Sequence, residues 1–114
     1  MIKIYHNPRC TKSRQALELL QKKGITPQVI LYLEQAPTKT EIKDILSKLK
    51  LSARDIIRKN EDEFKEQNLA DKTLSEEDLI AAIAKTTKLL ERPIVINGNK
   101  ACIGRPTENI LEIL

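Results

Sequence analysis

The chain has 114 residues, 40% hydrophobic and 32% charged, a composition typical of one soluble globular domain rather than of a membrane protein or a disordered one. Its net charge of +4 is modest and spread along the sequence, so it favours a small anionic substrate over nucleic acid. Two cysteines and one histidine are too few for a disulfide framework or a structural zinc site.

The N-terminal part of the sequence predicts a strand, a helix and a second strand. Residues 2–5 alternate as a short strand does, and they contain no secretory hydrophobic region, which predicts a cytoplasmic protein. His6–Arg9 has the composition of a turn. A helical period follows from Ser13 to Lys23 and stops at Gly24, and residues 28–33 are apolar and β-branched, as a second strand would be.

The middle of the chain, from about residue 38 to residue 90, predicts a series of helices. A serine or threonine followed three residues later by an acidic residue is a signal for a helix start, because each side chain can cap the other's backbone. Such starts are predicted at Thr38 with Glu41 and at Ser75 with Asp78, and shorter helices after Ser52 and over residues 61–68.

The last part of the sequence predicts a hairpin and a closing helix. Two apolar segments, 93–96 and 100–103, flank Asn97-Gly98, which is a strong hairpin signal. The helix predicted over residues 107–114 is expected to turn Ile110, Leu111 and Ile113 inward.

This order of elements predicts an α/β fold. A β-α-β unit implies a parallel strand pair, and the hairpin adds an antiparallel pair. The expected product is a thioredoxin-like mixed four-stranded sheet, β-α-β … β-β-α, with a helical insertion from about residue 38 to residue 90. Residues 1–114 are thus expected to form a single domain.

Cys10 is the candidate nucleophile, because it lies where the first strand leads into the first helix. The free N–H groups at a helix start stabilise a thiolate and lower the pKa of the thiol. Arg9, Lys12, Arg14 and a protonated His6 would add positive charge nearby. The alternative is that the cysteine is a small buried hydrophobic residue.

Ser13 stands three residues after Cys10, where a dithiol motif would carry its second cysteine. The motif is therefore C-x-x-S, and disulfide chemistry at Cys10 needs an external thiol or Cys102. The Ser13 hydroxyl could donate a hydrogen bond to the thiolate, or it could be an ordinary helix residue. For Cys102, strand packing is the favoured role.

Arg58, Arg92 and Arg105 are the candidate anion ligands, since guanidinium groups bind tetrahedral oxyanions through two parallel hydrogen bonds. Arg92 and Arg105 each precede a proline at the two ends of the predicted hairpin, which would place them at one edge of the sheet. The alternative for each arginine is a surface ion pair.

Five short motifs carry a resemblance that runs over essentially the whole chain. They are His6-Asn7-Pro8-x-Cys10-x-x-Ser13-Arg14, Tyr32-Leu33-Glu34, Arg58-Lys59-Asn60, Arg92-Pro93-Ile94-Val95 and Arg105-Pro106. In this order and at these intervals, the motifs resemble those of the glutaredoxin-coupled arsenate reductases, the ArsC family. The resemblance implies a thioredoxin-like fold with a helical insertion and a cis-proline at Pro93.

The resemblance also implies a role for each site residue. Cys10 would attack arsenate, with His6 influencing the charge around it and Ser13 supporting the thiolate. The oxyanion would be bound by Arg58, Arg92 and Arg105. Glutathione would then attack the adduct as a co-substrate, and glutaredoxin would resolve the mixed disulfide as arsenite leaves. No metal and no tightly bound cofactor would be needed.

The sequence departs from the best-known family members around the cysteine, where they carry a small residue before it and Gly-Thr after it. Here the neighbours are Arg9, Thr11 and Lys12, which could strengthen anion binding or direct it to a different oxyanion. Two other functions stay open. One is a thiol protein acting on glutathione mixed disulfides. The other is a transcription regulator of the Spx type, although such regulators typically use a C-x-x-C switch.

Overall fold

Four short strands form one mixed sheet in the order β2-β1-β3-β4 in the computed structural model. β1 runs parallel to β2 and antiparallel to β3, and β3 is antiparallel to β4. The strands are β1 (Ile2–Tyr5), β2 (Gln28–Ile30), β3 (Ile94–Asn97) and β4 (Lys100–Ile103). The predicted fold class, a thioredoxin-like mixed four-stranded sheet, is confirmed.

The structure describes residues 1–114, and these divide into two units. The first, Met1–Gln35 with Arg92–Leu114, holds the sheet, and the second, Ala36–Glu91, is helical and spans the predicted insertion. That the two units belong to one domain stays a prediction. The first unit contains α1 (Thr11–Lys22) and the 3₁₀ helix η2 (Thr107–Ile113), and the second contains α2 (Lys39–Leu49), α3 (Ala53–Ile56), α4 (Asp62–Glu66), α5 (Glu76–Lys85) and η1 (Thr87–Leu89).

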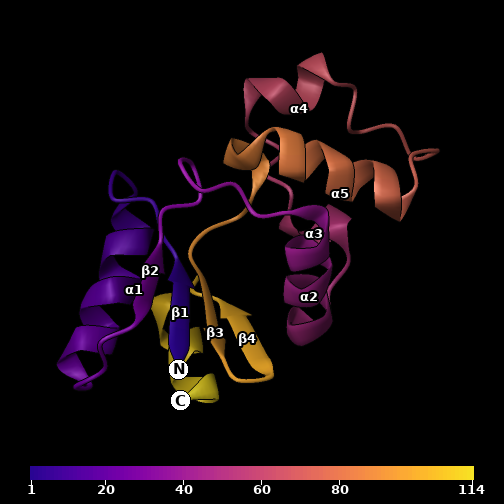
Figure 1. Ribbon diagram of the computed structural model, residues 1–114. Coiled ribbons are helices and arrows are strands. Elements are labelled where there is room, and N and C mark those ends of the chain that lie inside the picture. The colour runs from indigo at the N-terminus through magenta and orange to yellow at the C-terminus, as the bar shows by residue number, and fades with distance from the viewer. The chain divides into compact units, whose positions relative to one another are not determined.

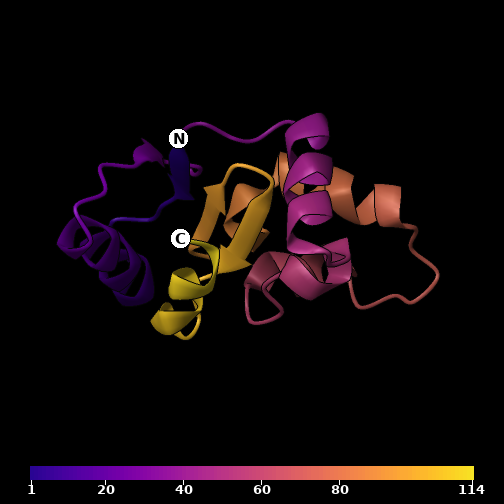
Figure 2. The same cartoon turned by 90° about the horizontal axis from the view of Figure 1, so that it is seen from below.

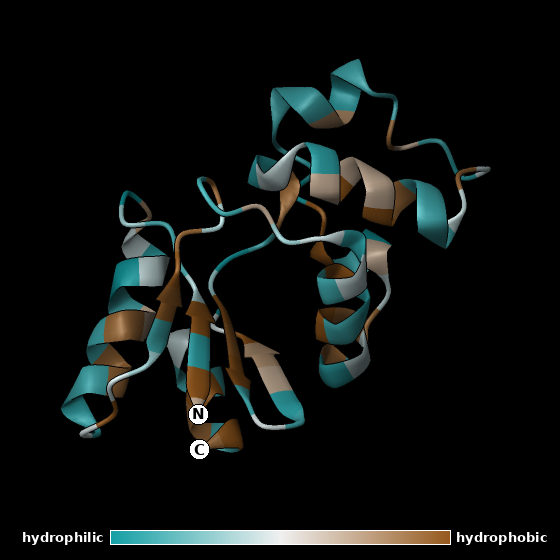
Figure 3. Ribbon diagram, in the orientation of Figure 1, coloured by the Kyte–Doolittle hydropathy of each residue, from teal (hydrophilic) through white to brown (hydrophobic).

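The core of the first unit lies between the sheet and two helices, α1 and η2, which cover the same face (Figure 2). Apolar residues from all three parts meet there, and burial of such side chains contributes about 1.5–3 kcal/mol each. In Figure 3 the apolar colour is concentrated in β1 and β3, which lie in the middle of the sheet. The fully buried members of this core are Ile4, Ala16, Leu20, Val95 and Ile110.

α1 ends as the sequence predicted. Gly24 has φ +76°, a left-handed conformation that favours glycine. Its N–H donates to the carbonyl of Gln21, and the N–H of Ile25 donates to that of Leu20. These two bonds satisfy carbonyls that the helix end would otherwise leave unpaired. The chain thereby turns sharply back towards β2.

Two predicted boundaries and the character of the last helix are corrected. β2 ends at Ile30 instead of Leu33, because the backbone turns at Leu31, whose carbonyl accepts the N–H of Glu34. The two-residue hairpin loop lies one position later, since Asn97 still pairs with Lys100 in the sheet. The last helix is a 3₁₀ helix with three residues per turn, which buries Ile110 and Ile113 and leaves Leu111 exposed.

In the second unit the two predicted long helices begin as expected. Thr38 and Glu41 cap each other's backbone at the start of α2, and Ser75 and Asp78 do the same at α5. α2 and α5 contact each other through buried aliphatic side chains. α4 is shorter than the predicted 61–68 and buries none of its residues. No helix of the structure has the length and apolar character needed to cross a membrane.

Candidate active site

Cys10 is the N-cap residue of α1, with extended backbone angles of φ −96° and ψ 122°. Its side chain is buried, with 8% of the residue exposed. The N–H of Cys10 donates to the carbonyl of Asn7, and its own carbonyl accepts the N–H of Arg14, so the loop and the first helical turn are joined. The first turn contains no acidic residue. The start of α1 thus offers positive potential to an anion.

The pKa of the Cys10 thiol lies below its ordinary value. Burial is the largest single influence, and it raises the pKa because it disfavours the charged form. The backbone N–H groups of Ser13 and Lys12 hydrogen-bond to the sulfur and lower the pKa. The charges of Arg92 and Arg105 also lower it. Together these stabilising contacts outweigh burial, so Cys10 ionises more readily than a free thiol.

His6 and Ser13 form a buried hydrogen-bonded pair, with 2.6 Å between the His6 Nδ1 and the Ser13 Oγ. The same hydroxyl accepts the N–H of Asn7 at 3.0 Å. The contact that Ser13 makes with the sulfur of Cys10 is through its backbone N–H, and a hydrogen bond from its hydroxyl to the thiolate stays a prediction. The hydroxyl ties the loop after β1 to α1.

His6 does not supply the positive charge that the sequence suggested. Burial, and after it the charge of Arg14, hold the pKa of His6 below its ordinary value of 6.5. The imidazole is therefore neutral at pH 7. In this state His6 fixes the loop through its hydrogen bond to Ser13, and its catalytic role stays a prediction.

Arg92 and Arg105 come together at one end of the hairpin, as their places beside Pro93 and Pro106 predicted. The Nε of Arg105 donates to the carbonyl of Arg92 at 2.7 Å. Its Nη2 lies 3.6 Å from the Sγ of Cys10. Both Arg-Pro peptide bonds are cis, which confirms the expectation for Pro93.

Arg58 lies in the second unit, Ala36–Glu91, just after α3. Its guanidinium forms an ion pair with the carboxylate of Glu61, which also lies 3.7 Å from the Nζ of Lys88. Its backbone N–H donates to the carbonyl of Leu89. The ion-pair interpretation of Arg58 thus describes this structure, and its role in binding an oxyanion stays a prediction.

Sequence reasoning did not predict the hydrogen bonds by which three residues hold the site together. The Asn7 carbonyl accepts the N–H of Cys10, and its side chain accepts the N–H of Arg9 at 3.0 Å. Arg14 donates to the carbonyl of Pro8 at 2.9 Å. Asn109 donates to the carbonyl of Arg105 at 3.1 Å. In the sequence, Asn7-Pro8 was a turn signal and Arg14 a nearby positive charge, and Asn109 carried no signal.

Cys102 lies on β4, where it packs against the core of the first unit. Burial and, to a lesser extent, the charge of Glu112 raise its pKa to about 11. Both cysteines are free thiols. No three His, Cys, Asp or Glu side chains converge as they would at a metal site.

The fold and the site together define the class of protein. This is a thioredoxin-like protein in which one thiol, rather than a dithiol, stands at the start of α1 and faces an arginine. Within that class, the chain belongs to the ArsC family, whose family model matches residues 5–113.

Relatives and solved structures agree with that assignment over nearly the whole chain. The protein YfgD of Escherichia coli K12, whose function is uncharacterised, is 53% identical over 99% of this chain and 96% of its own length. An arsenate reductase of Neisseria meningitidis is 50% identical over 99% of this chain and 97% of its own. The structure of an arsenate reductase from Vibrio cholerae superposes with a TM-score of 0.97 at 49% identity, covering 99% of this chain and 97% of the other.

Proposed function

We propose that the protein is an arsenate reductase in which Cys10 is the nucleophile. The observation that carries the proposal is the Arg105 guanidinium 3.6 Å from the readily ionised Sγ of Cys10. An oxyanion that binds there meets a nucleophile and a cation together. The arsenate reductases of N. meningitidis and V. cholerae that resemble this chain support arsenate as that oxyanion.

The first step is attack of the Cys10 thiolate on the arsenic atom. A sulfur–arsenic bond forms, one arsenic–oxygen bond breaks, and the leaving oxygen takes up protons and departs as water. Arg92 and Arg105 bind the remaining oxygens, and the N–H groups at the start of α1 stabilise their negative charge. His6 and Ser13 hold the loop so that the sulfur stays in line with those donors.

Arg58 is proposed as a further oxyanion ligand because of the family resemblance. Its guanidinium is paired with Glu61 in the structure, so binding of an oxyanion would exchange one anion for another. We expect Arg58→Gln to raise the KM for arsenate, whereas Lys59→Gln, at the exposed next position, leaves it unchanged.

External thiols supply the electrons in this proposal. The glutathione thiolate attacks the Cys10 sulfur of the adduct, so a sulfur–sulfur bond forms, the sulfur–arsenic bond breaks, and its electron pair goes to arsenic, which leaves as arsenite. Glutaredoxin then reduces the mixed disulfide between Cys10 and glutathione with its own thiol. In sum, arsenate and two thiols give arsenite, one disulfide and one water, so As(V) gains the electrons that the two sulfurs lose. The reaction uses no metal and no tightly bound cofactor, and it suits the cytoplasm, where glutathione is kept reduced.

The test is arsenite formation by the purified protein with glutathione, glutaredoxin and glutathione reductase, followed as arsenate-dependent NADPH oxidation. We expect turnover that is abolished in Cys10→Ser and retained in Cys102→Ser, because Cys102 belongs to the core. Absence of turnover in the unaltered protein would refute the proposal, and so would full turnover in Cys10→Ser.

A second candidate function is the handling of glutathione mixed disulfides without arsenate. The lowered pKa of Cys10 favours it equally, since a thiolate also attacks a disulfide, and the C-x-x-S motif suits a mixed disulfide that only an outside thiol resolves. Release of glutathione from a glutathionylated test peptide by the unaltered protein, without arsenate turnover, would select this function.

A further inference from the structure

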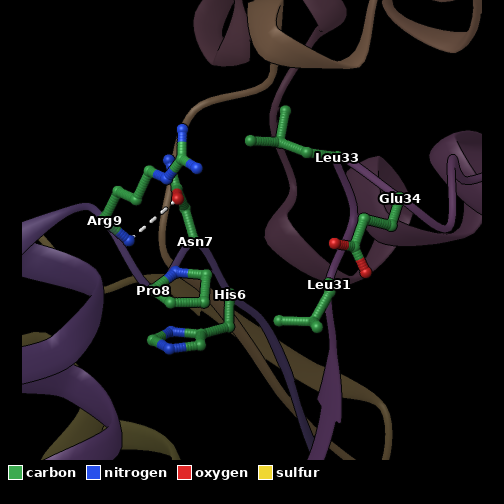
Figure 4. A pocket seen from close by; sticks show the side chains of 7 residues that line it. All are labelled: His6, Asn7, Pro8, Arg9, Leu31, Leu33 and Glu34. Carbon is green, nitrogen blue, oxygen red and sulfur yellow. Dashed lines mark hydrogen bonds between the residues drawn. The ribbon is translucent and has the colours of Figure 1, made fainter.

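A hollow of about 280 Å³ lies within the first unit, beside the loop that leads to Cys10. It is close to the lower limit of the range of about 300–1,000 Å³ that is typical of small-molecule sites. The loop after β1 forms one wall, and the turn after β2 forms the other (Figure 4). Its lining residues are His6, Asn7, Pro8, Arg9, Leu31, Leu33 and Glu34.

The two charged residues of the hollow have opposite signs and come from opposite walls. In Figure 4 the side chain of Arg9 stands on one side, and that of Glu34 stands on the other. Both residues are exposed, and neither side chain forms an ion pair with another residue. Leu31 and Leu33 line the Glu34 side with apolar surface. A ligand with both charges and an apolar part matches these walls.

We propose that this hollow binds the glutathione co-substrate. A carboxylate of the tripeptide pairs with Arg9, its ammonium group pairs with Glu34, and its peptide backbone lies along Leu31 and Leu33. The inference rests on the proposed function for the identity of the thiol. It goes further in giving that thiol a binding site of its own, separate from the arginines that face the sulfur of Cys10.

The hollow suits a zwitterion better than an inorganic oxyanion. The carboxylate of Glu34 repels an arsenate dianion, whereas it attracts an ammonium group. The charged groups that act on the Cys10 thiol are, by contrast, two arginines, Arg92 and Arg105. Arsenate and glutathione would therefore bind at different places in the first unit, because each place has the charges that complement one of them.

The hollow also lies next to Cys10 along the chain. Arg9 is the residue directly before Cys10, and adjacent Cα atoms are about 3.8 Å apart. In glutathione the thiol is on the central residue, between the glycine carboxylate and the longer γ-glutamyl group that carries the ammonium. Binding in the hollow would raise the local concentration of the attacking thiol, which is the usual gain from positioning a reactant.

The binding test uses the Cys10→Ser protein and S-methylglutathione, neither of which can form a disulfide with the other. We expect the ligand to shift the backbone amide NMR signals of residues 6–9 and 31–34. Arg9→Gln and Glu34→Gln should each raise the Kd about two- to fivefold, in keeping with the loss of one charged contact at an exposed site. The controls, Lys23→Gln and Glu66→Gln, change exposed charges elsewhere and should leave the Kd unchanged.

A matched ligand identifies the contact that Arg9 makes. S-methylglutathione with its glycine carboxylate amidated should bind about as weakly to the unaltered pocket as the parent ligand binds to Arg9→Gln. If the carboxylate and Arg9 contact each other, combining both changes adds little further loss. Equal, additive losses, or signal shifts confined to residues 92–106, would overturn the assignment of the hollow.

Kinetics separate this inference from the proposed function. In an active enzyme, Arg9→Gln should raise the KM for glutathione several-fold, and by a larger factor than it raises the KM for arsenate. If this variant turns over arsenate with an unaltered KM for glutathione, the hollow is not the glutathione site, and the proposed reductase activity stands. If the protein binds S-methylglutathione in the hollow but does not reduce arsenate, the proposed reductase activity is wrong, and the assignment of the hollow as a glutathione site stands.

Discussion

The Nη2 of Arg105 lies 3.6 Å from the Sγ of Cys10, although 95 positions separate the two residues in the chain. The same guanidinium donates through Nε to the carbonyl of Arg92 at 2.7 Å, and this bond fixes its direction. The hairpin of β3 and β4 thereby delivers a cation to the start of α1. This relationship makes Cys10 both more acidic and better placed to meet an anion.

Replacing Arg105 should weaken both properties. In Arg105→Gln the positive charge is lost while burial still disfavours the thiolate, so the pKa of Cys10 should rise towards its ordinary value. The pKa is measured from thiolate absorbance near 240 nm in a Cys102→Ser background, where Cys10 is the single thiol. Because Arg105 is exposed, we expect the loss in arsenate affinity to be about 1.5 kcal/mol, roughly tenfold.

Lys23→Gln is the control for that measurement, since Lys23 lies at the far end of α1. It removes the same charge without changing what faces Cys10. An equal rise in the pKa of Cys10 in both variants would mean that net charge, rather than the contact with Arg105, controls the thiol.

Ser13→Ala should destabilise the fold. Ser13 is fully buried, and its hydroxyl bonds both the N–H of Asn7 and the Nδ1 of His6. Alanine leaves both groups without that partner, at a cost of about 1–3 kcal/mol. Urea unfolding measures the loss, with Ser47→Ala on the exposed face of α2 as the matched control. Equal midpoints for the two variants would contradict a linking role for Ser13.

His6 should make stability depend on pH below 6.5. Because the folded protein holds the pKa of His6 below 6.5, the unfolded chain binds the proton more readily. The free energy of unfolding should therefore fall as the pH decreases through 6.5 to the folded pKa, and change no further through His6 below that. Urea midpoints at pH 7.5 and pH 5.5 test this expectation. His6→Asn should remove most of the difference, and an undiminished difference in that variant would assign it to other groups.

Local sequence patterns predicted the elements that depend on neighbouring residues. Gly24 ends α1, and Thr38 and Ser75 cap their helices, because each of these features is decided within a few positions along the chain. The hairpin brought Arg92 and Arg105 together for the same reason. The observed boundaries differ from the predicted ones where the backbone forms a local turn. At Leu31 the carbonyl accepts the N–H of Glu34, and β2 therefore ends earlier than predicted.

Features that depend on burial could not be predicted from such patterns. The sequence placed His6 near Cys10 but gave no sign that the imidazole would be buried and neutral. Nor did it show that the Ser13 hydroxyl would be engaged by Asn7 and His6. The ion pair between Arg58 and Glu61 lies within the predictable range of three residues, yet many such pairs on a charged chain are equally possible.

Gly104→Ala should disturb the arginine beside it. A Cβ at this position would lie 3.0 Å from the Cγ of Pro93 and 3.3 Å from the Cδ1 of Ile110. Ile110 is fully buried and cannot move freely, so we expect a loss of about 1–3 kcal/mol in the free energy of unfolding. The displaced backbone should also move Arg105 and raise the pKa of Cys10.

Gly98→Ala is the control for the glycine change. Gly98 has φ +64° in the hairpin loop, and nothing lies within 4 Å of its Cβ position. Alanine there strains the backbone, at a cost of about 1–2 kcal/mol, without touching the site. Both variants should unfold at lower urea concentrations, and only Gly104→Ala should change the titration of Cys10. A change in both would trace the effect to global loosening.

The two cysteines should differ strongly in reactivity. The pKa of Cys102 is raised to about 11, by burial first and then by Glu112, whereas that of Cys10 lies below 9.0. At pH 7 the thiolate is therefore a larger fraction of Cys10 than of Cys102. Iodoacetamide should label Cys10 faster, as followed by peptide mass spectrometry. Glu112→Gln should speed labelling of Cys102 alone, and comparable rates at the two thiols in the unaltered protein would place Cys102 outside the core.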